Sequence, residues 1–189
     1  MSNCNIDVKL FYCRINDVNK DMFDTFARLT LMSLEKININ EHDKPKYYLS
    51  ILSTFQTNRG CFVVGSENGQ IISLGYIKDA AKDRGAARLE FFVVVENYRG
   101  KKVGTYLMTH ICNKFNESSG ITLSCEKSLI SFYKKCGFVK PIKSSENNDY
   151  YTMHSKRSAR NTLYESAEVN DVIGAARQYL DARQYFGLN

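Results

Sequence analysis

The stretch that decides the fold is Phe92-Val93-Val94-Val95-Glu96-Asn97-Tyr98-Arg99-Gly100-Lys101-Lys102-Val103-Gly104-Thr105-Tyr106-Leu107. It continues an apolar run that begins at Phe91, and such a run of β-branched and aromatic residues is typical of a strand buried on both faces. After the loop, apolar residues recur every fourth position, as in a helix: Val103, Leu107, Ile111 and Phe115. The stretch therefore predicts a strand, a basic loop with glycines and a helix, in that order.

A helix that begins directly after such a loop points backbone N–H groups and the positive end of its dipole at one spot. Three cationic side chains, those of Arg99, Lys101 and Lys102, surround this spot. The combination favours a bound anion, phosphate above all. The alternative is a surface turn whose glycines serve the backbone alone and whose charges are solvated. A Walker loop is excluded because no Gly-Lys-Ser/Thr follows, and the three-glycine dinucleotide motif is also missing.

Composition places the chain among ordinary globular proteins. It has 189 residues, of which 43% are hydrophobic, enough for the core of one domain with an appendage. The six cysteines form no CxxC pair and have no metal-ligand spacing with histidine, so we expect reduced, mostly buried thiols and no metal site. No apolar run approaches the ~20 residues that span a membrane, and the N-terminus does not resemble a signal peptide. We therefore expect a cytoplasmic protein that makes no membrane contact.

The net charge of +6 is unevenly distributed. Residues 157–189 contain four arginines and four acidic residues, so the whole excess lies in residues 1–156. A basic domain suits a polyphosphate cofactor or a phosphorylated substrate. Nucleic-acid binding is the weaker alternative, because the chain has no recognition-helix or zinc-finger spacing.

The rest of the pattern predicts the order β-α-α-β-β-β-α-β-α-β-β. Asn16 and Asp17 are expected to cap the first helix, and Asn68-Gly69 is a strong signal for a hairpin turn. The expected strands are 7–15, 60–65, 71–77, 88–95, 120–125, 138–142 and 150–154, with helices at 18–33, after Asp43, from Val103 and at 127–135.

The motif Val93-Val94-Val95-(x)2-Tyr98-Arg99-Gly100-Lys101-x-Val103-Gly104-(x)2-Leu107 resembles the acetyl-CoA pyrophosphate loop of the GCN5-related N-acetyltransferases, the GNAT superfamily. The family pattern is Gln/Arg-x-x-Gly-x-Gly/Ala. Arg99 and Gly104 fit its outer positions, and Lys102 stands where the middle glycine usually lies. The resemblance implies a mixed α/β fold with a seven-stranded sheet covered by helices, the order of elements given above.

The same resemblance implies acetyl-CoA as co-substrate. The backbone of Phe92, Val93 and Val94 would pair with the pantetheine arm like an added strand. The residues that would hold the pyrophosphate are Arg99, Gly100, Lys101, Lys102, Val103, Gly104 and Thr105.

A second segment, Phe132-Tyr133-Lys134-Lys135-Cys136-Gly137-Phe138, resembles the end of the same fold. There the tyrosine protonates the thiolate that leaves after acyl transfer, a role that falls here to Tyr133; a phenol packed in a helix is the alternative. Glu90 is the candidate base for the amine, although a strand carboxylate can equally be ion-paired.

Over residues 7–156 the sequence is most similar to the glucosamine-6-phosphate N-acetyltransferase subfamily. The resemblance implies that the acetyl acceptor is a primary amine, with glucosamine 6-phosphate favoured. Thr30 and Ser124 would be the substrate-binding residues. It also implies a homodimer. Phe91, Ser124 and Leu129 depart from the subfamily's two aspartates and an asparagine. Acceptors such as a protein amine or a polyamine therefore stay open, as does a member that binds acetyl-CoA without catalysis.

Residues 157–189 lie beyond the acetyltransferase-like domain of residues 1–156. A helix is expected over 167–186, with an apolar face of Val169, Val172, Ile173, Ala176 and Leu180 and with Tyr179 beside it. It can fold back over the domain, contact a second subunit or form a mobile tail.

Overall fold

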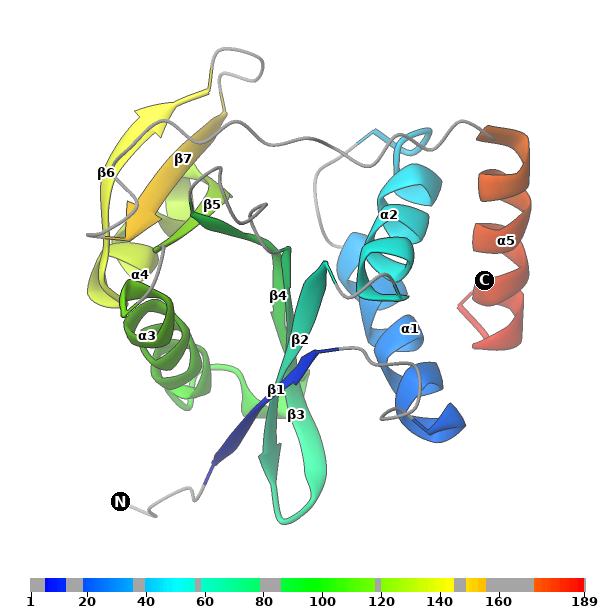
Figure 1. The fold of residues 1–189 in the computed structure, drawn as a ribbon, viewed down its shortest axis with the longest axis horizontal. Helices are drawn as coiled ribbons and strands as arrows, with labels where there is room; N and C mark the ends of the chain where they lie inside the picture. Colours follow the sequence, from blue (N-terminus) through cyan, green and yellow to red (C-terminus); the bar gives the residue numbers. More distant parts are fainter. Residues whose placement is uncertain are drawn as a thin grey trace. The chain divides into compact units, whose positions relative to one another are not determined.

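The computed structural model describes residues 6–12, 19–35, 40–56, 59–78, 86–117, 120–144, 149–155 and 172–188. The order of its strands and long helices confirms the predicted one, with a further helix at the C-terminal end (Figure 1). The strands are β1 (Asp7–Tyr12), β2 (Gly60–Glu67), β3 (Gln70–Lys78), β4 (Ala87–Val94), β5 (Ile121–Glu126), β6 (Phe138–Lys143) and β7 (Tyr150–Ser155). The α-helices are α1 (Lys20–Leu34), α2 (Lys44–Gln56), α3 (Val103–Asn116), α4 (Ile130–Lys135) and α5 (Val172–Tyr185), with short 3₁₀ turns η1 (Glu96–Tyr98) and η2 (Lys127–Leu129).

The strands form one mixed sheet in the order β1-β2-β3-β4-β5-β7-β6. β3 and β4 are antiparallel, β4 and β5 are parallel, and β7 pairs antiparallel with both β5 and β6. The predicted turn joins β2 to β3: both Asn68 and Gly69 have positive φ, 50° and 78°, as the tightest hairpin turns require. The mixed seven-stranded sheet of the GNAT fold is therefore confirmed.

The chain separates into two compact units, the larger formed by residues 1–10 and 63–164. In this unit α3 packs on β4 and β5 and also contacts α4. A cluster of Ile72, Val103 and Leu107 is fully buried at its centre. Gly65 allows this packing, because a methyl group there would lie 2.9 Å from Leu107 Cδ1. The start of α3 is thus anchored in the core.

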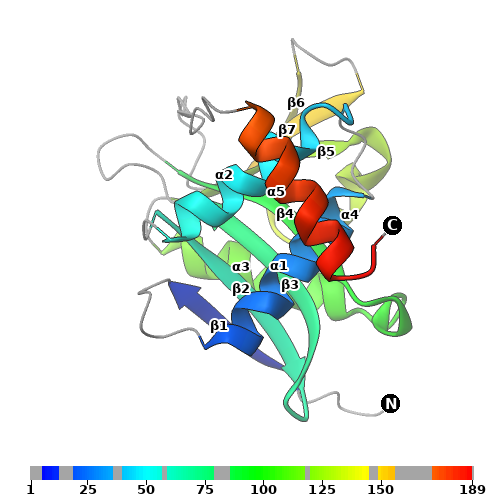
Figure 2. The same cartoon turned by 90° about the vertical axis from the view of Figure 1, so that its right-hand side faces the viewer.

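The smaller unit comprises residues 11–62 and 165–189, in which α5 packs against α2 and α1 (Figure 2). The first helix begins later than expected: its cap is Asn19, whose side chain accepts a hydrogen bond from Met22 N at 2.9 Å. Asn16 and Asp17 lie outside the described residues.

Helix α5 does not pack with the face that its sequence suggested. Ile173 and Leu180 are 78% and 61% exposed, whereas Ala175 and Tyr179 are buried. Tyr179 joins a cluster with Leu31, Leu34 and Tyr48, and its ring meets that of Tyr48 edge to face, with 5.8 Å between the ring centroids. The remaining part of the predicted helix, residues 167–171, lies outside the described residues.

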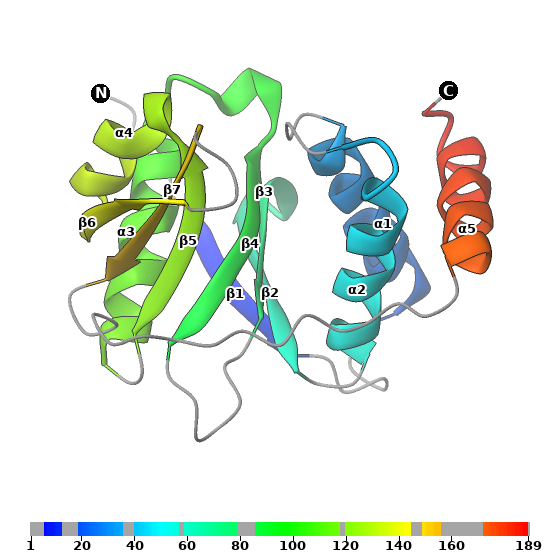
Figure 3. The same ribbon diagram turned by 90° about the horizontal axis from the view of Figure 1, so that it is seen from above.

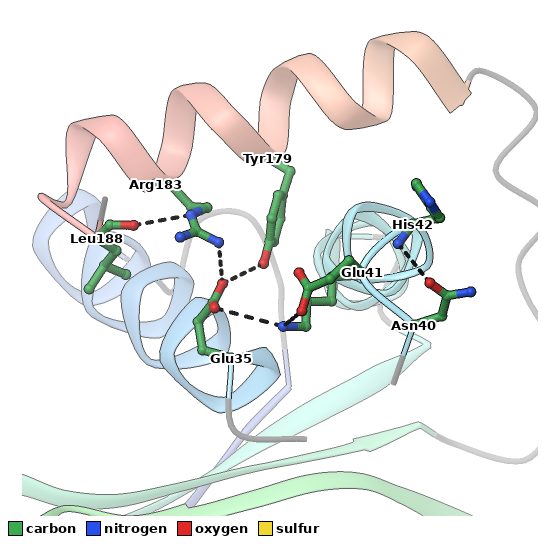
Figure 4. Close-up of polar contacts among 8 residues, drawn as sticks. Glu35, Asn40, Glu41, His42, Tyr179, Arg183 and Leu188 are labelled. Carbon is green, nitrogen blue, oxygen red and sulfur yellow. Dashed lines mark hydrogen bonds and ion pairs between the residues drawn. The ribbon is translucent and has the colours of Figure 1, made fainter. Parts of the chain in front are cut away.

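The face of α5 that packs also makes a polar contact at the end of α1 (Figure 4). The hydroxyl group of Tyr179 donates a hydrogen bond of 2.8 Å to Glu35 Oε1, and Arg183 forms an ion pair with the same oxygen. Lys44, whose side chain is only 5% exposed, places its Nζ 3.7 Å from Glu35 Oε2. One carboxylate therefore joins α1, α2 and α5.

In the stretches that the structure describes, no helix is both long and apolar enough to cross a membrane. Four cysteines in these stretches are buried and form no disulfide: Cys61, Cys112, Cys125 and Cys136.

Candidate functional site

The site is built where β4 and β5 separate. The two parallel strands form only three pairs, the last between Leu89 and Leu123. Both strands continue beyond this pair, β4 beside β3 as far as Val94 and β5 beside β7 as far as Glu126. They diverge toward their carboxyl ends (Figure 3). Among the described residues, therefore, no strand pairs on this side with the last residues of β4, the edge that the family resemblance implies for pantetheine.

A β-bulge lies at the point of separation. Tyr76 is paired with Phe91 and Ile77 with Leu89, so Glu90 has no partner residue on β3. A bulge of this kind increases the local twist and redirects a side chain. Glu90, the predicted base, is thus the residue whose orientation the bulge sets.

The structure brings Glu90 and Ser124 together through Arg88. Arg88 Nε lies 3.5 Å from Glu90 Oε2, and Arg88 Nη2 lies 3.4 Å from the hydroxyl oxygen of Ser124. The sequence interpretation overlooked Arg88. The signal was present, because residues two apart in a strand share a face and these two have opposite charges.

The basic loop after β4 is held by its own backbone and by Arg99. Arg99 Nε donates a hydrogen bond of 3.1 Å to the carbonyl oxygen of Val94 at the end of the strand. Gly100 and Lys102 both have left-handed backbones, with φ of 74° and 62°. The ammonium group of Lys101 lies 5.3 Å from the centroid of the Tyr98 ring. The positive φ of Lys102 is a conformation that glycine adopts most readily, which suits the glycine of the resembled family pattern.

Helix α3 begins directly after the loop. Its first backbone hydrogen bond runs from Tyr106 N to the carbonyl oxygen of Lys102, at 3.0 Å. The N–H groups of Val103, Gly104 and Thr105 precede this bond, and Lys102 provides no side-chain cap. An α-helix leaves such groups to an outside acceptor, and an anion is the preferred one.

Gly104 lies between two phenylalanine rings. A methyl group at this position would be 3.5 Å from Phe132 Cζ and 3.6 Å from Phe92 Cε1, both ordinary contact distances. The fold itself therefore tolerates a side chain at Gly104. The absence of one leaves room for a ligand to approach the helix terminus closely.

Tyr133 is held in α4 near the carboxyl end of β5. Its ring meets Phe132 and Phe138 edge to face, and only 9% of the residue is exposed. Burial raises the pKa of Tyr133, and the nearby Cys125 and Cys136 add to the rise. The phenol therefore stays protonated at neutral pH and is able to donate a proton.

The cysteines nearest to Tyr133 are poor nucleophiles. Burial raises the pKa of Cys125 to about 11, with Glu126 adding to the effect, and burial also raises the pKa of Cys136 to about 11. Because the thiolate is the reactive form, these thiols are chemically inert at neutral pH.

The other predicted substrate residue, Thr30, lies in the smaller unit. It is fully buried, and its hydroxyl donates a hydrogen bond of 2.7 Å to the carbonyl oxygen of Phe26 in the same helix. Its role in acceptor binding stays a prediction. Phe91, one of the departures from the subfamily, is buried and stacks on Tyr76. Within the described ranges, no three His, Cys, Asp or Glu side chains are grouped so that they could hold a metal ion.

Comparison with known proteins agrees with this geometry. Residues 58–140 match the family described as acetyltransferase (GNAT) domain. No curated protein matches the chain. Among similar solved structures, ElaA of Escherichia coli is 16% identical with a TM-score of 0.62, and the match covers 80% of this chain and 99% of that chain. An acyl-CoA N-acyltransferase of Pseudomonas aeruginosa is 15% identical with a TM-score of 0.60, covering 79% of this chain and 99% of that chain. The PaiA N-acetyltransferase of Thermoplasma acidophilum in complex with coenzyme A is 18% identical with a TM-score of 0.51, covering 79% of this chain and 99% of that chain.

At these identities the solved structures show the fold, and the family match covers the loop and the strands around it. The diverging strands, the basic loop and the free N-terminus of α3 all lie within the matched residues. Residues 58–140 are therefore similar to a GNAT acetyltransferase domain, and the described sheet and helices have the fold of these acyl-CoA N-acyltransferases.

Proposed function

We propose that the protein transfers the acetyl group of acetyl-CoA to a primary amine by direct attack. The observation that carries this proposal is the separation of β4 from β5 beside the free N-terminus of α3. An open strand edge suits the two amides of pantetheine, and the helix N-terminus with its cationic loop suits the pyrophosphate. A solved structure of similar fold, the PaiA enzyme, holds coenzyme A.

The side chains at the site suit the two proton transfers of this reaction. The amine nitrogen forms a bond to the thioester carbon, the carbon–sulfur bond breaks, and the sulfur leaves with the electron pair. Glu90 takes a proton from the amine, directly or through water, and Tyr133 gives its phenolic proton to the sulfur. The raised pKa of Cys125 and Cys136 argues against a covalent acetyl-enzyme.

Glucosamine 6-phosphate is the acceptor that we place first. The net charge of +6 lies entirely in residues 1–156, which suits a phosphorylated acceptor as well as the cofactor. Arg88 beside Ser124 weighs against a polyamine, because a second cation close to the guanidinium would be repelled. By resemblance to the subfamily we also expect a homodimer, and the cysteine pattern of the sequence favours a cytoplasmic location.

Calorimetry with acetyl-CoA, followed by a thiol-release assay, tests the proposal. The panel holds glucosamine 6-phosphate, glucosamine, spermidine and a short peptide with a free N-terminus. We expect acetyl-CoA to bind with a dissociation constant below about 1 mM. Glucosamine 6-phosphate should be acetylated at least about tenfold faster than glucosamine. No heat of binding at millimolar acetyl-CoA would end the acetyltransferase proposal. Binding without thiol release on every amine would indicate a member that binds the cofactor without catalysis.

A further inference from the structure

Arg88 occupies a defined place in the site, at the end of the β4–β5 pairing. It pairs with Thr122, one position before the strands separate. Its guanidinium group reaches Glu90 on its own strand and Ser124 on the neighbouring one, at 3.5 Å and 3.4 Å. The side chains of Arg88 and Glu90 are 30% and 19% exposed, so both are accessible to a small molecule. The guanidinium group thus bridges the point where the two strands part.

The charge at this point differs from that of a site built for a simple amine. The carboxylate of Glu90 is matched by the guanidinium group of Arg88, so the pair is neutral. Ser124 adds a hydroxyl group without charge. An acceptor that carries only positive charge meets no net attraction from this pair. An acceptor that carries an anion as well as its amine complements both members of the pair.

The contacts of Arg88 with Glu90 and Ser124 are long enough to be exchanged. Both lie at the outer limit of hydrogen-bond distance, whereas a guanidinium binds a carboxylate or phosphate oxygen at about 2.8 Å. Ser124 is exposed, so its hydroxyl group regains water when the contact is lost. Replacing a long contact with a hydroxyl by a short contact with an anion is therefore favourable.

We propose that Arg88 determines acceptor specificity by binding an anionic group, carboxylate or phosphate, on the acceptor while Glu90 faces the amine. This inference rests on the proposed acetyl transfer and narrows its acceptor to amines that carry an anion. Simple amines and polyamines are then not the preferred acceptors. The inference also assigns a role to Arg88, which belongs to neither the cofactor loop nor the proton-transfer pair.

The experiment compares Arg88→Gln and Arg88→Lys with the natural chain on two matched pairs of amines. Glucosamine 6-phosphate and glucosamine differ in a phosphate remote from the amine, whereas phenylalanine and phenylalaninamide differ in a carboxylate beside it. Arg177→Gln, at an exposed position of α5, is the charge-matched control. The readouts are kcat/KM for each amine by thiol release, and acetyl-CoA affinity by calorimetry.

We expect the natural chain to prefer the anionic member of one pair by about tenfold or more, and that pair identifies the anion. Arg88→Gln should remove most of this preference, because it should lower kcat/KM on the anionic member far more than on the neutral member. Arg88→Lys should restore part of it, and Arg177→Gln should behave as the natural chain. Acetyl-CoA affinity should be the same in all four proteins.

An unchanged preference in Arg88→Gln overturns the inference, as does an equal loss of rate on both members of each pair. If no amine is acetylated, binding of the same four amines to the protein saturated with coenzyme A decides the matter. A preference for the anionic member that depends on Arg88 then supports the specificity role, while acetyl transfer to these four amines is ruled out. No such preference in the natural chain overturns the specificity role.

Discussion

Burial controls what Tyr133 is able to do. Its ring is enclosed by Phe132 and Phe138, and burial raises the pKa of Tyr133 above that of a free phenol, about 10. A phenol in these surroundings holds its proton through the whole physiological range. It can donate the proton to a leaving thiolate, but it cannot serve as a base or a nucleophile at neutral pH.

Tyr133→Phe removes the donor and keeps the ring. We expect kcat to fall by about 10²-fold to 10⁴-fold, the usual contribution of a general acid, while the dissociation constant of acetyl-CoA stays within about twofold. Because the phenol stays protonated well above neutral pH, the ratio of the two rates should be constant from about pH 7 to pH 9. Steady-state kinetics and calorimetry at three pH values measure both quantities. A variant with the natural kcat would remove Tyr133 from the mechanism.

At the scale of an element, the N-terminus of α3 has unpaired N–H groups and the space for an anion to reach them. The left-handed backbone at Gly100 and Lys102 turns the loop so that the helix begins at Val103. Gly104 then leaves the second helical position without a side chain. Because an added methyl group would make only ordinary contacts, packing does not require this glycine, and we propose that it allows the ligand to approach.

Gly104→Ala separates these two effects. Alanine is the better helix former, so the free energy of unfolding should stay equal or rise by up to about 1 kcal/mol. The affinity for acetyl-CoA should fall about tenfold to hundredfold, the usual range when a methyl group crowds a close contact. His110→Ala, at an exposed position of the same helix, is the control, since it alters the helix without touching the loop. Urea unfolding and calorimetry give the two numbers. A fall in both would show that Gly104 is required by the fold.

The sequence predicted those features that depend on neighbours along the chain. An apolar run that ends at Val94 predicts a strand, and the basic loop after it predicts a turn. Apolar residues at every fourth position from Val103 predict a helix. The structure has all three elements. Contacts between strands were not predictable in the same way. The bulge at Glu90 depends on the register of β3, and the contact between Arg88 and Ser124 depends on where β4 and β5 separate.

Helix α5 shows the opposite error, in which a clear local pattern led to the wrong face. Ile173 and Leu180 are the large aliphatic residues of this helix. On another face, however, Tyr179 forms a hydrogen bond and Arg183 an ion pair with Glu35. The face that packs buries the ring of Tyr179 and also gives the Glu35 carboxylate a hydroxyl and a guanidinium partner. Hydrophobic periodicity does not contain this information.

At the scale of the whole molecule, the C-terminal helix is part of a compact unit with residues 11–62. Two tyrosines lie at its centre, and both are sensitive to alkali. Burial raises the pKa of Tyr48 to about 12, with Asp24 adding to the rise. Burial also raises the pKa of Tyr179 to about 12, and the carboxylate of Glu35 that accepts its hydrogen bond adds to this. Protonated tyrosines thus favour the folded unit.

The direction of the pH effect follows from these values. An unfolded tyrosine has a pKa of about 10, so between about pH 10 and pH 12 the folded chain holds protons that the unfolded chain has lost. The stabilisation is fully present below about pH 10 and is lost as the pH rises toward 12. Each tyrosine contributes a decline of at most about 1.4 kcal/mol per pH unit.

Tyr179→Phe should therefore give a stability curve that crosses the natural one. At pH 7 the variant lacks the hydrogen bond to Glu35 and should be less stable by about 1–2 kcal/mol. Above about pH 10 its stability should decline less steeply, because one of the two titrating groups is gone. Urea unfolding by circular dichroism from pH 7 to pH 11.5, with tyrosinate absorbance recorded in parallel, measures both slopes. Arg177→Gln, exposed on the same helix, should give a curve parallel to the natural one. Parallel curves for Tyr179→Phe would mean that Tyr179 titrates normally and that α5 is held by its other contacts, chiefly the ion pair between Arg183 and Glu35.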